Sequence, residues 1–400
     1  MLVTFLYDPK LGGGAAQAVY SLAHELEKRG YEVIVVTSGP NKKIENHFID
    51  GIKIISFYPS NLYWIYEKDN HPLWQKIIWQ IIDIWNPFVY RIFKKIVQEE
   101  KPDVVHIHKL RGFSPSVWKA CKDAGVVKLI QTSHDYEIVS PQGIRCGFLG
   151  KLIDSKSKLL IPYQFLRKLS SRHIDSFTSP SETLMQYFTD VNFFPNAEKY
   201  LIPNMYPYGN RNEKRTDLKF SEREPNVLRI LFLGRLEKEK GIWVLCHAVQ
   251  KAISEGFSIE LDIAGSGSQE EELIKYCNKE LNIHFWGFIK GEQKEKLLTQ
   301  CDIVCLPSII PEVFPISALE TLAFGKPAIV SSTDGLMDIF TDGKTGFFTK
   351  VGDIDELCSK IEFISRNKYL LKSMGNNCLI ESQKYSPEII LAQFETIYNK

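Results

Sequence analysis

The stretch LVTFLYDPKLGGGAAQAVYSLAHELEKRGYEVIVVTS, residues 2–38, decides the fold. It begins with an apolar run typical of a buried strand, continues through three glycines, and then places apolar residues at helical spacing. Gly30 is suited to end that helix, and a second apolar run, YEVIVVTS, follows it. The order strand, glycine-rich turn, helix, strand predicts a βαβ unit with two parallel strands.

The same alternation recurs along the chain. In the first half, helical patterns separate the strand-like runs PDVVHIH, VVKLIQTSH and IDSFTSP. A polar, proline-punctuated stretch at 203–226 predicts a linker, and a second series of strands follows it: LRILFLG, FSIELDIAG, NIHFWGF, DIVCLPS and KPAIVSS. We therefore expect an α/β protein of two Rossmann-like, doubly wound domains, with boundaries at 1–205 and 206–385. A C-terminal helix at 386–400 is expected to pack back on the first domain.

Length and composition favour a globular protein of more than one domain. A chain of 400 residues exceeds what one hydrophobic core usually covers, and 44% hydrophobic with 24% charged residues is ordinary for a globular protein. The net charge of +1 argues against a general nucleic-acid binder. The eight cysteines lack the spacing of a zinc site and the density of a disulfide scaffold. Met1 leads straight into a strand-like run, and no run is long enough to span a bilayer, so we expect a cytoplasmic protein without a secretion signal.

Basic residues mark the start of the second half. Doubly wound sheets bind ligands at the carboxyl ends of their strands, so we expect the active site in a cleft between the domains. Arg235 and Lys240 follow the strand LRILFLG and precede Gly241, where the next helix starts. A guanidinium, an ammonium and a helix N-terminus suit a diphosphate, and a solvated basic turn is the alternative. Gly265 and Gly267 supply only part of a dinucleotide fingerprint.

The N-terminal glycines also suggest a dehydrogenase. That function needs an acidic residue near the end of the second strand to bind a ribose, but YEVIVVTS runs into GPNKK. A role for NAD is therefore disfavoured. Gly13 and Gly14 still allow backbone N–H groups to approach a phosphate or a sugar closely.

Two carboxylates mark the segment PEVFPISALE, residues 311–320. Glu312 and Glu320 are separated by seven uncharged residues. Glu312 follows the strand DIVCLPS in a proline-stiffened loop, and Pro315 suits the first turn of a helix that carries Glu320. Two acids placed in this way can accept hydrogen bonds from two sets of hydroxyls, one on a sugar and one on a ribose. The alternative for Glu320 is a capping box with Ser317, which satisfies backbone N–H groups alone.

Together these motifs resemble one family. GRLEKEKG at 234–241, PEVFPISALETLAFGKPAIVSS at 311–332 and DGKTGFF at 342–348 are similar to the donor-binding half of family 4 glycosyltransferases, which have the GT-B fold. The resemblance covers nearly the whole chain, because the N-terminal glycine-rich segment, KPDVVHIH, TSHDYEIVSPQG, SPSETL and LIPN occur in the family's order. The family's Gly-Gly-x-x-Glu element reads DGLMD here, at 334–338, and this departure leaves details of donor choice open.

The resemblance implies a retaining transfer from a nucleotide-diphosphate sugar that needs neither a cofactor nor a divalent metal. Arg235 and Lys240 would neutralise the diphosphate. Glu312 would bind hydroxyls of the transferred sugar and Glu320 those of the ribose, while His134 would stand near the anomeric carbon. Further donor contacts are implied for the glycine-rich segment, for the loop along the base and for the start of the helix at 316: Gly13, Gly14, Phe288, Ile289, Phe314, Pro315, Ile316 and Ser317.

Other functions fit parts of this pattern. Two carboxylates in a cleft suit a glycosidase, although hydrolysis has no use for Arg235 and Lys240. A nucleotide-sugar epimerase of the same fold, or a sugar-nucleotide binder without catalysis, would keep the donor site. His106 and His108 project from one face of a predicted strand and could hold a metal, but a third ligand cannot be named, and buried strand histidines are the alternative.

Aromatic and basic residues mark the acceptor side. Between residues 145 and 172, seven basic residues accompany one acid. Such amphipathic segments are typical of an interfacial membrane contact, and a helical pair buried in the N-terminal domain is the alternative. We expect a saccharide or lipid-linked saccharide acceptor, peripheral contact with the inner face of the membrane and, by the resemblance, a role in bacterial surface polysaccharide synthesis. Four of the seven tryptophans fall within 22 residues: Trp64, Trp74, Trp79 and Trp85.

Overall fold

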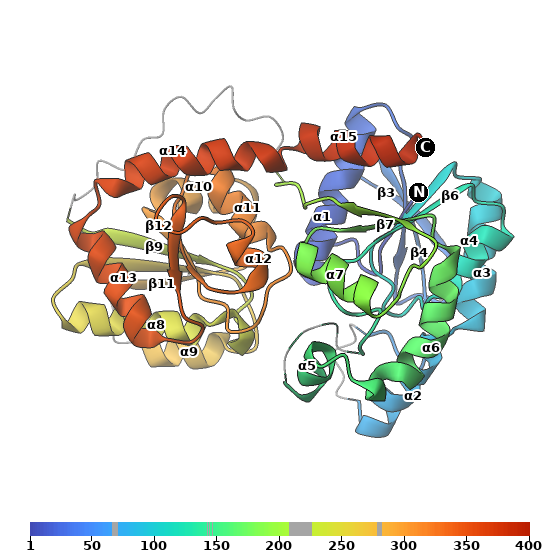
Figure 1. Ribbon diagram of the computed structural model, residues 1–400, viewed down its shortest axis with the longest axis horizontal. Coiled ribbons are helices and arrows are strands. Elements are labelled where there is room, and N and C mark those ends of the chain that lie inside the picture. The colour runs from blue at the N-terminus through green and yellow to red at the C-terminus, as the bar shows by residue number, and fades with distance from the viewer. Residues whose placement is uncertain (66–70, 142, 144, 146, 208–225, 278–281) are drawn as a thin grey trace. The chain divides into compact units, whose positions relative to one another are not determined.

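The computed structural model describes residues 1–65, 71–141, 143, 145, 147–207, 226–277 and 282–400. The chain forms two compact units, one of Met1–Met205 with Pro387–Lys400 and one of Tyr206–Ser386 (Figure 1). Most of the linker predicted at 203–226 lies outside the described residues. Each unit is built on a mainly parallel sheet, so the protein has the expected pair of Rossmann-like domains.

The first unit contains a sheet in the order β3-β4-β2-β1-β5-β6-β7-β8. The chain runs outward from β1 to one edge and then returns to build the other side from β5, so the topological switch lies between β1 and β5. The elements of this unit are β1 (Leu2–Val3), α1 (Pro9–Lys28), β2 (Ile34–Ser38), β3 (Glu45–Ile49), β4 (Ile52–Phe57), α2 (Leu73–Ile84), α3 (Pro87–Glu100), β5 (Val104–Ile107), α4 (Ser116–Asp123), β6 (Lys128–Thr132), α5 (Gly147–Asp154), α6 (Ile161–Ser170), β7 (Ser176–Ser179), α7 (Glu182–Asp190), β8 (Glu198–Leu201) and α15 (Pro387–Tyr398).

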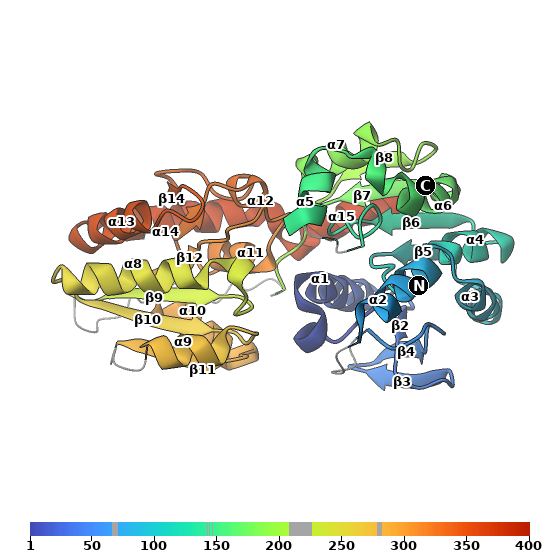
Figure 2. The same ribbon diagram turned by 90° about the horizontal axis from the view of Figure 1, so that it is seen from below.

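The second unit contains a wholly parallel sheet in the order β11-β10-β9-β12-β13-β14 (Figure 2). Its switch lies between β9 and β12, which pair in parallel with Ile303 opposite Ile230. The elements of this unit are β9 (Leu228–Leu233), α8 (Ile242–Ser254), β10 (Ile259–Ala264), α9 (Glu270–Cys277), β11 (Ile283–Gly287), α10 (Gly291–Gln300), β12 (Ile303–Leu306), α11 (Ile316–Ala323), β13 (Ala328–Ser331), α12 (Asp334–Met337), β14 (Gly346–Thr349), α13 (Ile354–Arg366) and α14 (Leu370–Ser382).

Two local features of the first unit differ from the sequence expectation. β3 pairs antiparallel with β4 and is largely exposed, because an edge strand needs no apolar face on its outer side. The three glycines fall at a break between a short helical segment and the long helix, and not directly after the strand. They lie inside α1, whose helical dihedrals break at Gly13 with φ 63° and ψ −150°. Glycine adopts that conformation without the steric cost that a Cβ would bring.

The C-terminal helix α15 belongs to the core of the first unit. Ile390 and Phe394 lie in one buried cluster with Val19 and Leu22 of α1 and Ile54 of β4. The seven described cysteines are all buried and unbridged, while Cys146 lies outside the described residues. Within the described part of the chain, no helix has the length and apolar character needed to cross a bilayer.

We predict that two adjacent isoleucines of α15 differ sharply in their contribution to stability. Ile390 is fully buried, whereas Ile389 is 45% exposed. Ile390→Ala should lower the free energy of unfolding by about 2–5 kcal/mol because it leaves a cavity, and Ile389→Ala should cost less than about 1 kcal/mol. Urea denaturation of both variants tests this. Equal losses would show that α15 does not pack on the first unit as described.

Candidate functional site

The switch point of the second sheet brings the predicted donor residues together. β9 ends at Leu233 and is followed by Arg235, and its neighbour β12 ends at Leu306 and is followed by Ser308. The two loops touch, because the backbone N–H of Ile309 donates to the carbonyl of Glu239 at 2.9 Å. Residues 72 positions apart in the sequence, 240 and 312, therefore meet at the carboxyl edge of the sheet.

Lys240 and Glu312 form an ion pair at this edge. Lys240 Nζ lies 2.6 Å from Glu312 Oε1, and Ser308 Oγ donates to the same oxygen at 2.5 Å. Burial by itself raises the pKa of Glu312, but the charge and hydrogen bond of Lys240, the Ser308 hydroxyl and the charge of Arg235 outweigh it and hold the pKa below its ordinary value. Glu312 is thus ionised at neutral pH. Its Oε2 makes no hydrogen bond within the described chain and can accept one from a ligand hydroxyl.

Arg235 is held more loosely than Lys240. Its side chain is 58% exposed, and Nη2 lies 3.1 Å from Glu239 Oε1. Exposed ion pairs of this kind contribute only about 0–1 kcal/mol, so the guanidinium can turn to an anionic ligand at little cost. The structure therefore offers one fixed and one adjustable cation beside the N-terminus of α8.

Glycines let these loops approach one another closely. Gly241 has φ +70°, and a Cβ there would lie 1.8 Å from the carbonyl oxygen of Pro307. A Cβ on Gly265 would lie 1.7 Å from the carbonyl oxygen of Gly234. These glycines are explained by backbone packing between the loops after β9, β10 and β12, which accounts for Gly265 without a dinucleotide fingerprint.

Glu320 is buried on α11 and is not part of a capping box. The N-cap of α11 is Pro315, which makes no side-chain cap bond and lies just before the helix rather than within its first turn. Ser317 lies two residues beyond the N-cap position, inside the helix. Glu320 is 2% exposed and pairs with Lys294 of α10, whose Nζ lies 2.5 Å from Oε2. The capping-box alternative is therefore wrong, and the acid has a cationic partner that the sequence analysis missed.

The loop before α11 rests on α12. Gly335 N–H donates to the carbonyl oxygen of Glu312 at 3.0 Å, and a Cβ on Gly335 would lie 2.2 Å from the carbonyl oxygen of Val313. Phe314 is buried edge-on against Tyr385, with ring centroids 5.7 Å apart. The family element that reads DGLMD here thus keeps one glycine for close backbone contact with the loop that carries Glu312.

The remaining predicted donor contacts lie at helix starts and loop ends. Ile316 and Ser317 form the first turn of α11, whose N–H groups have no earlier carbonyl in the helix. Phe288 is exposed and Ile289 is buried, directly after β11. In the first unit, Gly13 and Gly14 are exposed at the kink of α1.

Three histidines form a row at the carboxyl ends of β5 and β6. His134 Nε2 lies 3.1 Å from His108 Nδ1, with the rings stacked. His106 uses both ring nitrogens, on Tyr398 at 2.8 Å and on Thr132 at 2.6 Å, and neither nitrogen is left for a metal. His106 is therefore a satisfied core residue, and His134 is oriented by His108.

Burial keeps these histidines neutral. It lowers the pKa of His134 to about 4, and the Lys109 ammonium lowers it further against the opposing effect of Asp135. Burial also lowers the pKa of His106 and of His108 well below the ordinary range. At neutral pH, His134 can offer a hydrogen bond to a ligand without adding a charge.

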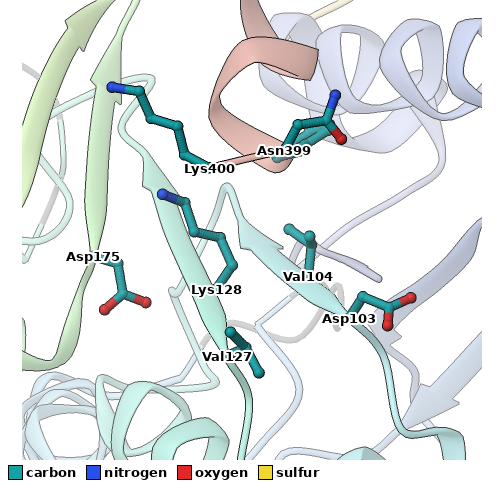
Figure 3. Close-up of a pocket in the computed structure, with 8 residues that line it drawn as sticks. Asp103, Val104, Val127, Lys128, Asp175, Asn399 and Lys400 are labelled. Atoms are coloured by element: carbon teal, nitrogen blue, oxygen red, sulfur yellow. The ribbon is translucent and has the colours of Figure 1, made fainter.

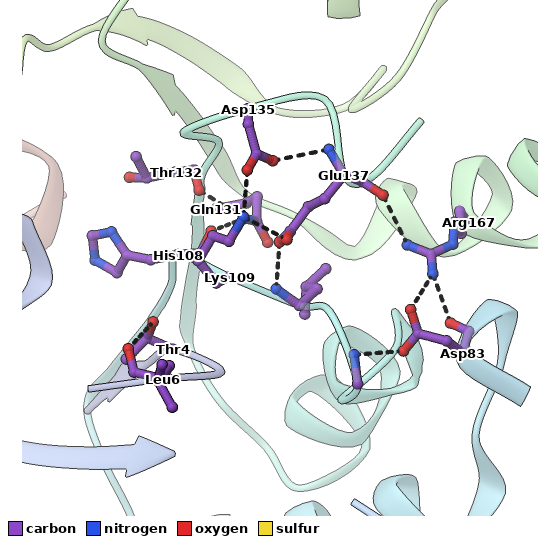
Figure 4. Close-up of polar contacts among 12 residues, drawn as sticks. Thr4, Leu6, Asp83, His108, Lys109, Gln131, Thr132, Asp135, Glu137 and Arg167 are labelled. Atoms are coloured by element: carbon purple, nitrogen blue, oxygen red, sulfur yellow. Dashed lines mark hydrogen bonds and ion pairs between the residues drawn. The ribbon is translucent and has the colours of Figure 1, made fainter. Parts of the chain in front are cut away.

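A polar network that the sequence analysis missed fixes the loop of His134. Lys109 Nζ lies 2.5 Å from Asp135 and 2.6 Å from Glu137 (Figure 4). Asp83 of α2 pairs with Arg167 of α6 at 2.7 Å, and both side chains are almost fully buried. The sequence signal for Lys109 was available, because it directly follows the strand end VVHIH. The pairing of Asp83 with Arg167 spans 84 positions and left no local signal.

A pocket lies at the opposite edge of the first sheet (Figure 3). Its lining includes Asp103, Lys128 and Asp175, which precede β5, lie at the start of β6 and precede β7. Asp175 already accepts from Lys122 at 2.6 Å and from the backbone of Leu129. Because doubly wound sheets bind ligands at their carboxyl edge, this pocket is not the candidate site.

Within the described residues, one group of three His, Cys, Asp or Glu side chains lies close enough together to hold a metal ion. It consists of Glu255, Cys358 and Glu362. Glu255 is exposed and Glu362 is half-buried, and acidic groups at a surface often cluster without an ion. We assign no metal to them.

We predict that Gly241 is required by contact and not only by its dihedral angle. Gly241→Ala must displace the Pro307 carbonyl as well as bear a positive φ, so it should cost about 2 kcal/mol more than Gly256→Ala. Gly256 is the matched control, with φ +92° and nothing within 4 Å of its Cβ position. Thermal denaturation of the two variants compares them, and equal losses would contradict the close approach of the two loops.

We predict an acid-sensitive contribution to stability from His134. Unfolded histidine takes up a proton near pH 6.5, whereas folded His134 does so only near its pKa of about 4. Falling pH therefore stabilises the unfolded chain, and each such histidine removes up to about 1.4 kcal/mol per pH unit in this window. The stability difference between the wild type and His134→Gln should shrink by this slope from pH 6 to 4.5, as measured by urea denaturation. Parallel curves would show that His134 is not buried as described.

Family comparisons agree with this architecture. Residues 12–207 match the model of Glycosyltransferase Family 4, and residues 213–378 match that of Glycosyl transferases group 1. A 42.6 kDa protein in the cps region of Klebsiella pneumoniae is 26% identical over 371 residues, covering 92% of this chain and 94% of the relative. The phosphatidyl-myo-inositol mannosyltransferase of Mycolicibacterium smegmatis is 23% identical over 402 residues, covering 98% and 91%.

Solved structures have the same fold. The Anabaena protein HepE in complex with UDP-glucose superposes with a TM-score of 0.66 at 19% identity, covering 100% of both chains. The fold is therefore GT-B, and the matches do not support the epimerase and glycosidase alternatives. The two family models account for both units in chain order, and the chain belongs to glycosyltransferase family 4.

Proposed function

We propose that this glycosyltransferase moves a sugar from a nucleotide-diphosphate sugar to a saccharide or lipid-linked saccharide, with retention at the anomeric carbon. One observation carries the proposal: Arg235, Lys240 and Glu312 meet at the switch point of a parallel sheet. Two cations with an ionised acid beside them suit a diphosphate and a sugar hydroxyl, respectively.

The leaving group explains the cations. When the bond between the sugar and the diphosphate breaks, negative charge grows on the departing oxygen, and groups already in place stabilise it best. Lys240 is fixed by Glu312, Arg235 can turn from Glu239, and the first turn of α11 adds the positive end of a helix dipole. These protein groups supply the charge that a divalent metal would otherwise supply, so the proposed reaction needs no metal and no cofactor.

The acids and the remaining loops bind the neutral parts of the donor. Glu312 Oε2 accepts a hydrogen bond from a hydroxyl of the transferred sugar. Glu320 accepts hydrogen bonds from the ribose hydroxyls, and the ammonium of Lys294 neutralises the charge of this buried carboxylate. Phe288 and Ile289 pass along the base, and Phe314 to Ser317 line the diphosphate.

The first unit supplies the other side of the reaction. Neutral His134 hydrogen-bonds the sugar near its anomeric carbon, and Gly13 with Gly14 brings backbone N–H groups to the donor or the acceptor. In the retaining reaction, the departing phosphate oxygen takes the acceptor's proton on the same face of the sugar. His134 therefore acts by positioning and not as a base, in keeping with its low pKa.

The relatives suggest a biological setting. One is encoded in a cps region and another is a mannosyltransferase acting on phosphatidyl-myo-inositol, so we propose cytoplasmic synthesis of a surface polysaccharide on a lipid-linked acceptor. HepE binds UDP-glucose, which makes uridine diphosphate sugars the first donors to test.

The test pairs two basic residues of one turn. Arg235→Ala should lower kcat/KM for transfer by about 100-fold or more, because a cation at the leaving group is lost, while the melting temperature hardly changes. Lys238→Ala, also exposed and in the same turn, is the matched control and should keep wild-type transfer. A thermal-shift panel of nucleotide diphosphates and their sugars chooses the donor, since a ligand bound only by the folded state raises the melting temperature.

Further readouts separate the parts of the proposal. NMR should show the donor's anomeric configuration in the product, and transfer should persist in EDTA. Equal activity of Arg235→Ala and Lys238→Ala, or no shift with any sugar nucleotide, would refute the donor site. An inverted product would refute retention alone.

A further inference from the structure

The helix α2 exposes an apolar face. Leu73, Trp74, Ile77 and Ile81 are exposed between 51% and 73%, although the inner side of the helix is already buried through Trp79. A helix that is apolar on all sides is normally surrounded by protein or lipid, and a helix at a water boundary normally has a polar outer side. α2 does pair with another helix of the first unit, α6, as the alternative expected, but its outer side stays exposed, and Trp74 is the exposed member of the tryptophan cluster.

The helix α6 repeats the pattern. Ile161, Phe165 and Leu169 recur every four residues, so they lie on one side of the helix, and they are 52%, 64% and 49% exposed. The inner side carries Arg167, which is buried and stacks on Tyr163 with 4.3 Å between the guanidinium carbon and the ring centroid. The outer side of α6 is thus also apolar without a partner among the described residues.

A buried ion pair holds these two helices together. Arg167 Nη2 donates to Asp83 Oδ2 at 2.7 Å and to the Asp83 carbonyl at 2.8 Å, and Gly112 N–H donates to Asp83 Oδ1. α2 and α6 contact one another and lie side by side in the first unit (Figure 1). The exposed apolar residues of the two helices named above are called the α2–α6 face, and the ion pair fixes the two helices against each other.

Cations without an ion-pair partner lie on these helices and on the segments that precede α6. Lys76 on α2, Lys151 on α5, Lys158 before α6 and Lys168 on α6 make no ion pair within the described chain. Asp154 is the one acid among residues 145–172, and it forms an ion pair with Arg145, with 2.6 Å between Nε and Oδ1. In a chain whose net charge is only +1, this is a local positive excess.

We propose that the α2–α6 face docks on an anionic lipid surface. Apolar side chains enter the interface between headgroups and acyl chains, and the lysines named above meet lipid phosphates. A second copy of the chain fits less well, because it would bring the same lysines against one another. This inference goes beyond the proposed function and uses none of its donor residues.

The position of the face agrees with its role. Tyr163 OH donates to the carbonyl of Glu137 at 3.1 Å, and Gln164 Nε2 donates to that of Val139 at 3.0 Å. α6 is therefore tied to the loop that follows His134, at the carboxyl edge of the first sheet. A membrane bound there lies next to the edge where the first unit would receive an acceptor.

Vesicle flotation with the full chain tests the proposal. The protein should float with vesicles of phosphatidylcholine mixed with phosphatidylglycerol and much less with phosphatidylcholine alone, and salt should weaken the binding. Ile77→Ser with Phe165→Ser should reduce the vesicle-bound fraction more than tenfold in partition coefficient. Lys151→Gln with Lys158→Gln should reduce the coefficient by about fivefold per lysine, and only on the anionic vesicles.

Matched controls lie in the second unit. Tyr369→Ser with Ile380→Ser changes two large apolar residues that are 76% and 70% exposed, and Lys350→Gln with Lys372→Gln removes two exposed cations. Both control pairs should bind vesicles like the wild type. All changed residues are exposed, and unchanged melting temperatures would show that every variant folds.

Three results would overturn the inference. The first is a wild-type chain that stays at the bottom of the gradient with anionic vesicles. The second is equal flotation of the face variants and the controls. The third, by light scattering after gel filtration, is a dimer without lipid affinity that Ile77→Ser with Phe165→Ser converts to a monomer, which would assign the face to a second copy. Donor-induced thermal shifts should be the same in all these variants, so failure here would leave the donor site standing.

Discussion

The ion pair between Lys240 and Glu312 is the interaction on which the candidate site depends. Both charges lie at the edge of a parallel sheet whose interior is apolar, and an acid left there without its cation would be costly. Ser308 and Gly241 support the pair, one by a hydrogen bond and the other by allowing two backbones to touch. The loops after β9 and β12 are thereby held in one arrangement, with one carboxylate oxygen and one guanidinium available to a ligand.

The first unit uses a buried ion pair for a different purpose. Burial raises the pKa of Asp83 to about 6 even though Arg167 and the Gly112 N–H lower it, so the pair adds little net stability. The ion pair instead fixes the positions of α2, α6 and the loop after β5 relative to one another, because Asp83 binds both Arg167 and the Gly112 N–H. Arg167 is also 3.5 Å from the carbonyl of Glu137, which links the same pair to the loop of His134.

The charges of the two units are arranged in opposite ways. In the second unit, Lys240 and Lys294 each face an acid at close range, which prepares them for a ligand without an excess of charge. Around α2 and α6, the lysines lack acids and border apolar side chains. The first arrangement suits a small anionic molecule that is bound and released, and the second suits an extended anionic surface.

The sequence by itself determined the two Rossmann-like domains and singled out the residues that are predicted to bind the donor. Both follow from local patterns. Buried strands appear as continuous apolar runs, and the loop after a parallel strand lies at the carboxyl edge of the sheet, as the loops that carry Arg235 and Glu312 do. Only the tertiary structure decided the partners. Lys294 for Glu320, Arg167 for Asp83 and the row from His106 to His134 join segments far apart in the chain, and nothing near either residue encodes the other. The same holds for exposure: the apolar pattern of α2 fits a buried helix equally well, and only the packing of the whole unit leaves its outer side in contact with water.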